Sequence, residues 1–381
     1  MTFDSYTLGE VCSFIDYRGK TPKKATTGIP LITAKIVKNG FISKPDEFIA
    51  EEDYDSWMHR GIPRKGSVIM TTEAPLGEVA RIPSDDRLAF AQRIIVLEPR
   101  QEILDAGFLY YALRDSVLMG RIKSRATGTT VTGIKAAELK KVEIDCPPIE
   151  TQKRVASLLS SLDQRIENNE SINDNLLQQL QAIYQQIFDS ASRNDGVLSD
   201  ICSYSQRRVA VASLTLESYY STENMLPEKA GAVSASSLPT IVQTTGCAPG
   251  DVLISNIRPY FKKIVYCRSE CGCSTDVLCF VPMEPCLSPF LFSTLYDDRF
   301  FDYMVAGSKG TKMPRGDKQQ IMAYPVVKPS NTQLERFNAL GEPILAKIES
   351  SNQENKRLSA IRDALLPKLM SGEIDVSSIT L

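Results

Sequence analysis

The interval between Ile149 and Gly196 contains no glycine or proline, and it constrains the fold more than any other part of the chain. Apolar residues and two asparagines recur there in steps of three and four, over about four heptads. These seam positions are Leu159, Leu162, Ile166, Asn169, Asn173, Leu176, Leu180, Ile183 and Ile187. The spacing predicts a long helix over residues 151–191 that packs along a partner helix, with Thr151 expected to cap its start.

The same pattern returns in the second half of the chain, where Ile344 corresponds to Leu162 at a numbering offset of 182. The second predicted helix, with the C-terminal tail, covers residues 331–381. Its seam positions are Ile344, Ile348, Ser351, Asn355, Leu358 and Leu365. Both seams carry a polar interruption near the middle, which is typical of paired helices whose register is fixed by buried polar residues. An antiparallel pair would place Asn169 against Asn355 and Asn173 against Ser351. The alternative is two ordinary core helices in separate domains.

The segments outside the helices, residues 1–150 and 192–330, are rich in short strand-like runs separated by glycine and proline. One helical stretch, Leu104–Leu118, is expected in the first segment. A Gly-Thr sequence also repeats, since Gly128-Thr129-Thr130 matches Gly310-Thr311-Lys312 at the same offset. We therefore expect an α+β fold. Two mixed α/β domains would be separated by two long helices, packed as an antiparallel coiled coil, with an internal pseudo-two-fold.

The composition excludes several classes of protein. A net charge of −2 means that the chain as a whole is not a basic nucleic-acid binder, so such a role needs local patches. No signal peptide and no apolar run of membrane-spanning length is recognised. Nine cysteines without a secretion signal then indicate reduced thiols and a cytoplasmic protein with no membrane partner.

The motifs of common enzymes are missing. No two glycines stand two residues apart, so a dinucleotide-binding loop is excluded, and a single histidine, His59, excludes multi-histidine metal sites. Five cysteines cluster from Cys267 to Cys286, but their spacing is too irregular for a zinc site. Pro45-Asp46 and Glu138-Leu139-Lys140 imitate a nuclease motif but lie far apart in the chain. We therefore expect no catalytic residue, no metal and no cofactor in this chain.

Four basic clusters stand out, at residues 18–24, 121–141, 258–268 and 309–318. Any one of them is most simply a solvated surface. Two, however, occupy matched places in the repeat, where glycine allows close backbone approach and Thr, Lys and Arg suit phosphate oxygens. The candidate DNA-binding residues are Arg18, Lys20, Thr21, Lys35, Arg125, Thr129, Thr130, Arg258, Tyr260, Lys262, Lys309, Thr311, Lys312 and Arg315. Arg258, beside Pro259, is the best candidate for reading guanine, with an ion pair as the alternative.

Several of these segments together resemble the specificity (S, or HsdS-like) subunit of type I restriction–modification systems, over essentially the whole chain. The resemblance rests on Gly66–Ile69, Gly128–Val131, Lys140–Ile144, Pro147–Val155 and Leu365–Gly372. It implies two target recognition domains, at 1–150 and 192–330, joined by conserved spacer helices. It implies a bipartite, asymmetric site in double-stranded DNA, with each domain reading one half.

The resemblance also implies partners. Two modification (methyltransferase) subunits and then restriction (endonuclease and translocase) subunits would assemble on the chain, which itself would be non-catalytic. S-adenosylmethionine, ATP and magnesium would belong to those partners. The alternative function is a coiled-coil adaptor or scaffold that joins proteins without touching DNA. A self-contained enzyme is the less favoured third possibility, because the cofactor loops are missing.

Overall fold

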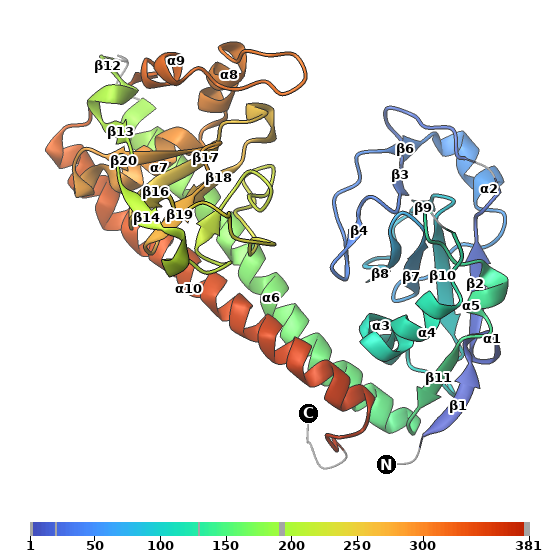
Figure 1. Ribbon diagram of the computed structural model, residues 1–381. Coiled ribbons are helices and arrows are strands. Elements are labelled where there is room, and N and C mark those ends of the chain that lie inside the picture. Colours follow the sequence, from blue (N-terminus) through green and yellow to red (C-terminus); the bar gives the residue numbers. More distant parts are fainter. Residues whose placement is uncertain (1–2, 20, 129, 190–194, 377–381) are drawn as a thin grey trace. The chain divides into compact units, whose positions relative to one another are not determined.

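The computed structural model describes residues 3–19, 21–128, 130–189 and 195–376. These fall into two compact units. The first holds the described residues up to Glu167 together with those from Asn355 onward, and the second holds those from Asn168 to Glu354. Each unit therefore contains one α/β domain and one half of each long helix. Figure 1 labels the helices and strands of both units.

The first unit is built on a four-stranded sheet of order β2-β10-β7-β8. Its strands are β1 (Asp4–Thr7), β2 (Cys12–Asp16), β3 (Ile29–Ile32), β4 (Val37–Lys38), β5 (Phe41–Ile42), β6 (Phe48–Ile49), β7 (Val68–Thr72), β8 (Leu76–Arg81), β9 (Ala89–Phe90), β10 (Ile94–Pro99) and β11 (Glu143–Cys146). Its short helices are α1 (Leu8–Val11), α2 (Tyr54–Trp57), α3 (Ala106–Arg114), α4 (Ser116–Ser124) and α5 (Ala136–Leu139). Smaller sheets pair β1 with β11, β3 with β6 and β9, and β4 with β5.

Side chains that alternate along β7 fill two separate cores of this unit. Met70 packs with α3 in one buried cluster, whereas its neighbour Ile69 packs with β3 and β9 in another. Successive residues of a strand point to opposite faces, so a strand buried on both sides reads as a continuous apolar run. This is why β7 carries no polar alternation until the threonines at its end.

The second unit repeats this plan. Its strands are β12 (Gly196–Val197), β13 (Cys202–Tyr204), β14 (Arg208–Ala210), β15 (Tyr219–Tyr220), β16 (Gln243–Cys247), β17 (Val252–Ser255), β18 (Ile264–Tyr266), β19 (Cys271–Cys273), β20 (Val277–Pro282) and β21 (Pro325–Val326). Its short helices are α7 (Ser288–Tyr296), α8 (Asp298–Ala306) and α9 (Lys318–Met322). The sheet order β13-β20-β17-β18 reproduces that of the first unit, and β12 pairs β21 as β1 pairs β11.

The helices repeat at the same sequence offset. The first residue of α7 matches the first residue of α3, and the first residue of α8 matches that of α4. The predicted single helix over Leu104–Leu118 is wrong, because α3 and α4 are separated at Asp115, whose backbone is extended. The Asp115 carboxylate accepts a hydrogen bond from the Val117 amide at 2.9 Å, which caps the new helix. Asp297 breaks and caps the second unit's helices in the same way.

The two long helices are α6 (Ile149–Tyr184), which continues as a π-helical segment (Gln185–Asp189), and α10 (Asn331–Met370). Within each unit, half of α6 lies against half of α10 (Figure 1). α6 begins at Ile149, so Thr151 stands inside its first turn and the expected cap at Thr151 is wrong. The mixed α/β architecture with long helices confirms the predicted fold class.

The predicted seam positions of α6 are all buried or half-buried, as are those of α10. Two polar contacts of the seam lie within the second unit. Asn169 donates to Glu354 at 3.1 Å, and Asn173 donates to Asn352 at 2.9 Å instead of meeting Ser351. Ser351 is fully buried nonetheless. The polar layer therefore lies where the sequence places it, with its bonds made to side chains beside the seam.

Candidate nucleic-acid interface

A tight turn follows the end of β17 in the second unit. Arg258 has the left-handed backbone conformation, with φ 50° and ψ 63°, and Pro259 opens a short 3₁₀ helix directly after it. Non-glycine residues rarely adopt positive φ, so other contacts must hold the turn. The Arg258 amide donates to the Pro314 carbonyl at 2.8 Å, which ties the turn to a loop much later in the chain.

That loop carries the Gly-Thr sequence. Lys309 and Arg315 close it through two backbone hydrogen bonds, of 2.9 and 3.0 Å, and Ile257 pairs with Arg315 beside it. Gly310 turns the chain at φ 102°, which a residue with a side chain reaches only with strain. Thr311 and Lys312 stand exposed at the tip. The fold thus brings Arg258 and the basic loop at 309–315 together in one place.

The first unit contains the same two features, a positive-φ turn before a proline and a Gly-Thr loop. Ala74 has φ 48° and precedes Pro75 after the end of β7, where Arg258 stands in the second unit. Thr127 and Gly133, at the positions that match Lys309 and Arg315, close the equivalent loop through hydrogen bonds of 2.8 and 2.9 Å. Glu73 pairs with Gly133 as Ile257 pairs with Arg315. Thr130 is exposed in this loop, while Thr129 and Lys20 lie outside the described residues.

Some of the other candidate residues lie beside these two loops, and others lie elsewhere in their unit. Arg18 donates to the Ile134 carbonyl at 3.0 Å, so it lies at the base of the first loop, and Arg125 lies just before that loop. Lys262 follows the Arg258 turn, and Tyr260 is exposed within it. Thr21 is exposed in the coil after Arg18. Lys35 lies on a separate segment, where it pairs with Asp46.

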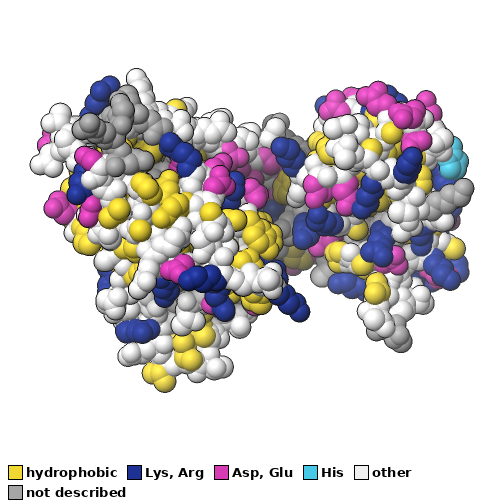
Figure 2. All heavy atoms as spheres, turned by 90° about the horizontal axis from the view of Figure 1, so that it is seen from above, with side chains coloured by type: hydrophobic (Ala, Val, Ile, Leu, Met, Phe, Trp, Pro, Cys, Tyr) yellow, Lys and Arg dark blue, Asp and Glu magenta, His cyan; other side chains and the backbone are white. Residues whose placement is uncertain are grey.

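Most of the candidate cations have an acidic neighbour. The pairs are Arg18–Asp16 at 3.0 Å, Lys35–Asp46 at 2.6 Å, Arg125–Glu138 at 3.4 Å, Lys262–Asp298 at 2.9 Å, Lys309–Asp317 at 2.6 Å and Arg315–Asp276 at 3.1 Å. Figure 2 shows the same mixture, with Lys and Arg lying among Asp and Glu on the face that it draws of each unit. This arrangement explains how a chain with net charge −2 carries basic loops.

Two of the acidic neighbours, Asp298 and Asp317, have lowered pKa values. Hydrogen bonds from Lys229 and Lys262 hold the pKa of Asp298 below its usual value. Lys309 likewise lowers the pKa of Asp317, with help from backbone amides at the start of α9. Exposed ion pairs of this kind contribute little to stability, so a phosphate can replace the carboxylate at small cost. Lys312 has no carboxylate partner among the described residues, and neither has Arg258.

The Arg258 turn also contains polar atoms without partners. Asn256 Oδ1 and Arg258 Nε are both buried, and neither has a hydrogen-bond partner among the described residues. Such atoms are rare in folded proteins. Asn256 was not among the candidates from the sequence, although it stands two residues before Arg258. An amide and a guanidinium on one rigid turn are the two side-chain types that read purine edges bidentately.

The described residues offer neither a metal site nor a membrane span. In the described ranges, no group of three or more His, Cys, Asp and Glu side chains has the arrangement of a metal site. Cys247, Cys267, Cys271, Cys273 and Cys279 are buried together in an apolar core of the second unit. Among the described helices, none has the length and apolar character needed to cross a bilayer.

Comparison with known proteins is consistent with this geometry. Residues 2–178 match the family model described as "Type I restriction modification DNA specificity domain". The MjaIX specificity subunit of a type I restriction enzyme from Methanocaldococcus jannaschii is 25% identical over 388 aligned positions, covering 92% of this chain and 88% of that protein. The EcoKI specificity subunit from Escherichia coli is 22% identical over 165 positions, covering 43% of this chain and 35% of its own.

A solved structure shows the same fold. The S subunit of a type I restriction–modification system from M. genitalium superposes with a TM-score of 0.54 at 18% identity. The match covers 97% of this chain and 96% of that one. The likeness therefore extends over both units and both long helices, beyond the residues that the family model covers.

Proposed function

We propose that this chain, which is similar to HsdS-like specificity subunits, is the DNA sequence-recognition subunit of a type I restriction–modification system. Each α/β domain reads one half of a bipartite, asymmetric site in double-stranded DNA. The observation that carries this proposal is the repeated pair of features in both units. A positive-φ turn before proline lies beside a Gly-Thr loop, at matched places and with different side chains.

The division of roles follows from the chemistry of each side chain. Lys312, Lys309 and the threonine hydroxyls contact phosphates, because they are exposed and flexible. Arg258 reads a base edge in the major groove, because its turn is rigid and its Nε has no partner among the described residues. Ala74 occupies the equivalent position in the first domain and cannot make this contact, so the two half-sites differ.

The second part of the proposal concerns the long helices α6 and α10. They set the distance between the half-sites, since successive major-groove faces on one side of DNA lie roughly 34 Å apart. Their outer surfaces bind two modification subunits, and restriction subunits join that complex. S-adenosylmethionine, ATP and magnesium then belong to these partners, and the assembly works where the genome lies, in the cytoplasm. The chain itself supplies recognition and no catalytic group.

Enrichment from a random library of double-stranded DNA tests the proposal. The full chain should retain a bipartite motif with one spacer length, whose second half is lost in the Arg258→Ala variant. Retention of no motif would favour an adaptor that does not touch DNA. Adenine methylation by the isolated chain with S-adenosylmethionine would contradict the non-catalytic assignment.

A further inference from the structure

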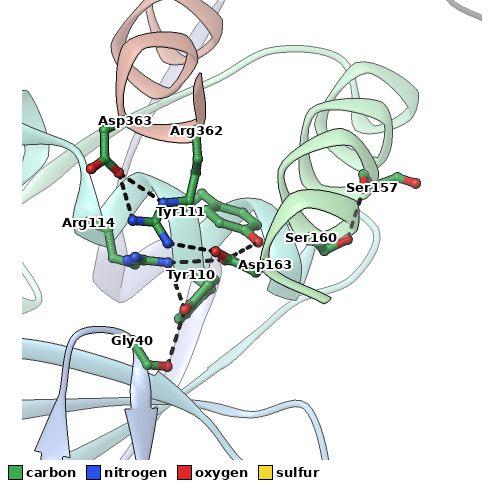
Figure 3. A network of polar contacts seen from close by, with 9 residues as sticks. All are labelled: Gly40, Tyr110, Tyr111, Arg114, Ser157, Ser160, Asp163, Arg362 and Asp363. Atoms are coloured by element: carbon green, nitrogen blue, oxygen red, sulfur yellow. Dashed lines mark hydrogen bonds and ion pairs between the residues drawn. The ribbon is translucent and has the colours of Figure 1, made fainter. Parts of the chain in front are cut away.

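A buried ionic network occupies the first unit at the point where its domain meets the long helices (Figure 3). Its centre is Asp163 of α6, which is only 6% exposed. One carboxylate oxygen accepts from the Tyr111 hydroxyl at 2.7 Å and from Arg114 at 3.3 Å. The other accepts from Arg362 of α10 at 2.8 Å. Both oxygens of this carboxylate thus face donors from other elements.

The network continues in both directions. Arg114 Nη1 donates to the Tyr110 hydroxyl at 2.8 Å, and that hydroxyl donates to the Gly40 carbonyl, between β4 and β5, at 3.1 Å. At the other end, Arg362 also pairs with Asp363 at 2.8 Å. One chain of polar contacts therefore runs from a domain loop through α3 and α6 to α10, as the dashed lines in Figure 3 trace.

Two groups of the network have pKa values that fit their roles as donors. Burial alone would lower the pKa of Arg362, but its bonds to Asp163 and Asp363 outweigh this and raise it. Burial and the neighbouring carboxylate raise the pKa of Tyr111, so its hydroxyl stays protonated and acts as a donor. A buried charge is tolerated only when its partners are in place, so the network permits one geometry and penalises others.

The second unit has different side chains at the matched positions. At the offset of 182, Leu345 replaces Asp163 and Leu180 replaces Arg362, and both leucines are buried in one apolar cluster. Ser293 stands where Tyr111 does, and its hydroxyl has no partner among the described residues. Apolar contacts are non-directional and tolerate sliding, whereas the ionic network does not. The two domain–helix junctions therefore differ at these positions: charged side chains meet in the first unit, and leucines meet in the second.

We propose that Asp163, Arg362 and Tyr111 are positioning residues that lock the register of the helix pair and the seating of the first domain on it. They thereby fix the spacer between the DNA half-sites. Sliding α10 by one heptad would place Asn355 or Leu369 opposite Asp163 and leave one oxygen of that carboxylate without the Arg362 guanidinium. This inference rests on the proposed function, since a spacer exists only for a protein that reads two half-sites.

The test is a triple variant that gives the first junction apolar side chains like those of the second. It combines Asp163→Leu, Arg362→Leu and Tyr111→Phe in the full chain, so that no charge or hydroxyl of the central triad is left unpaired. Arg114 keeps its bond to Tyr110. Asp163→Leu alone leaves Arg362 with only the exposed Asp363 as an acidic partner and the Tyr111 hydroxyl without its acceptor, so it is expected to melt at a clearly lower temperature than the triple variant. Ser160→Ala is the matched control, because this α6 hydroxyl bonds to the Ser157 carbonyl of its own helix, at 3.1 Å.

The readout is the spacer distribution retained from a random double-stranded DNA library. We expect one spacer length for the natural chain and for Ser160→Ala, and more than one for the triple variant with both half-site motifs kept. A folded triple variant that retains only the natural spacer would overturn the inference while leaving the proposed function intact. Absence of any bipartite motif with the natural chain would instead refute the proposed function itself.

Discussion

Matched positions in the two domains share a positive φ but carry different side chains. Ala74 and Arg258 both have positive φ before a proline, and Thr130 and Lys312 stand at the same place in the two Gly-Thr loops. A non-glycine residue with positive φ costs free energy, and such residues cluster at functional sites. Both domains have one at this position. The backbone therefore presents one position per domain to the target, and the side chain at that position decides what is read.

Replacing Arg258 with alanine should weaken binding to the preferred half-site by about 1–3 kcal/mol and relax the sequence preference there. Non-specific binding should change little, because the turn reads base edges. Competition binding with matched and mismatched duplexes measures this difference. Equal losses on both duplexes would mean that Arg258 contacts phosphate.

Replacing Lys312 with alanine should weaken binding to all sequences alike. A lysine that neutralises one phosphate releases about one counterion, so the slope of log affinity against log salt should fall by about 0.9. Titrations at several salt concentrations check this value. An unchanged slope with altered sequence preference would contradict the phosphate role.

Replacing Asp298 with asparagine should strengthen DNA binding. This carboxylate now pairs with Lys229 at 2.8 Å and Lys262 at 2.9 Å, and its removal frees both ammonium groups for phosphates. The salt dependence should become steeper by up to about one counterion per lysine. Asp302→Asn, an exposed acid on the same helix, is the matched control, and equal effects of the two would indicate a general change in charge.

In the pair formed by α6 and α10, the polar layer of the seam contains buried atoms that lack hydrogen-bond partners among the described residues. Asn173 Oδ1 and Ser351 Oγ are buried without hydrogen-bond partners among the described residues, beside apolar layers that pack in the ordinary way. Buried polar seam residues lower stability but restrict the register and the partners of a coiled coil. The ionic network at Asp163 adds a second restriction of the same kind within the first unit.

The Asn173→Leu variant should therefore be more stable, by about 1 kcal/mol, because a buried amide whose oxygen has no hydrogen-bond partner among the described residues is exchanged for apolar contact. Chemical unfolding gives the free energy, and light scattering should detect additional associated species. Asn175→Leu, at an exposed position two residues along the helix, is the control and should not be stabilised. A destabilised Asn173→Leu chain would show that the Asn173–Asn352 bond contributes more than the buried amide costs.

For the chain as a whole, the helix pair is the element that both units share. Removing residues 170–176 and 348–354 takes one heptad from each helix and keeps the seam in phase. The pair shortens by about 10 Å at ~1.5 Å per residue, so the accepted spacer should shorten by roughly three base pairs. Library enrichment with the shortened chain measures the new spacer. Binding with the natural spacer would show that the helices do not set it.

Much of the fold follows from local patterns that a sequence displays directly. The long helices are specified by heptad spacing and by the scarcity of glycine and proline, and the Gly-Thr loops by glycines at positive φ. Helical spacing does not predict the break at Asp115, because a capping aspartate looks like any other polar residue within a helical segment. Asp115 is seen to correspond to Asp297 only when the two repeats are aligned over the short helices as well as the long ones.

Sequence alone determined the duplication, the two long helices and the Gly-Thr loops, because a repeat, a heptad spacing and a turn glycine are all written in the order of residues along the chain. Which distant groups meet is known from the folded chain alone. The tertiary structure placed Arg258 against Pro314, gave Lys309 and Lys262 acidic partners, and buried Asp163 between Arg362 and Tyr111. The reason is physical: the energy of a charge depends on its burial and its partners, and both are set by residues far away in the chain.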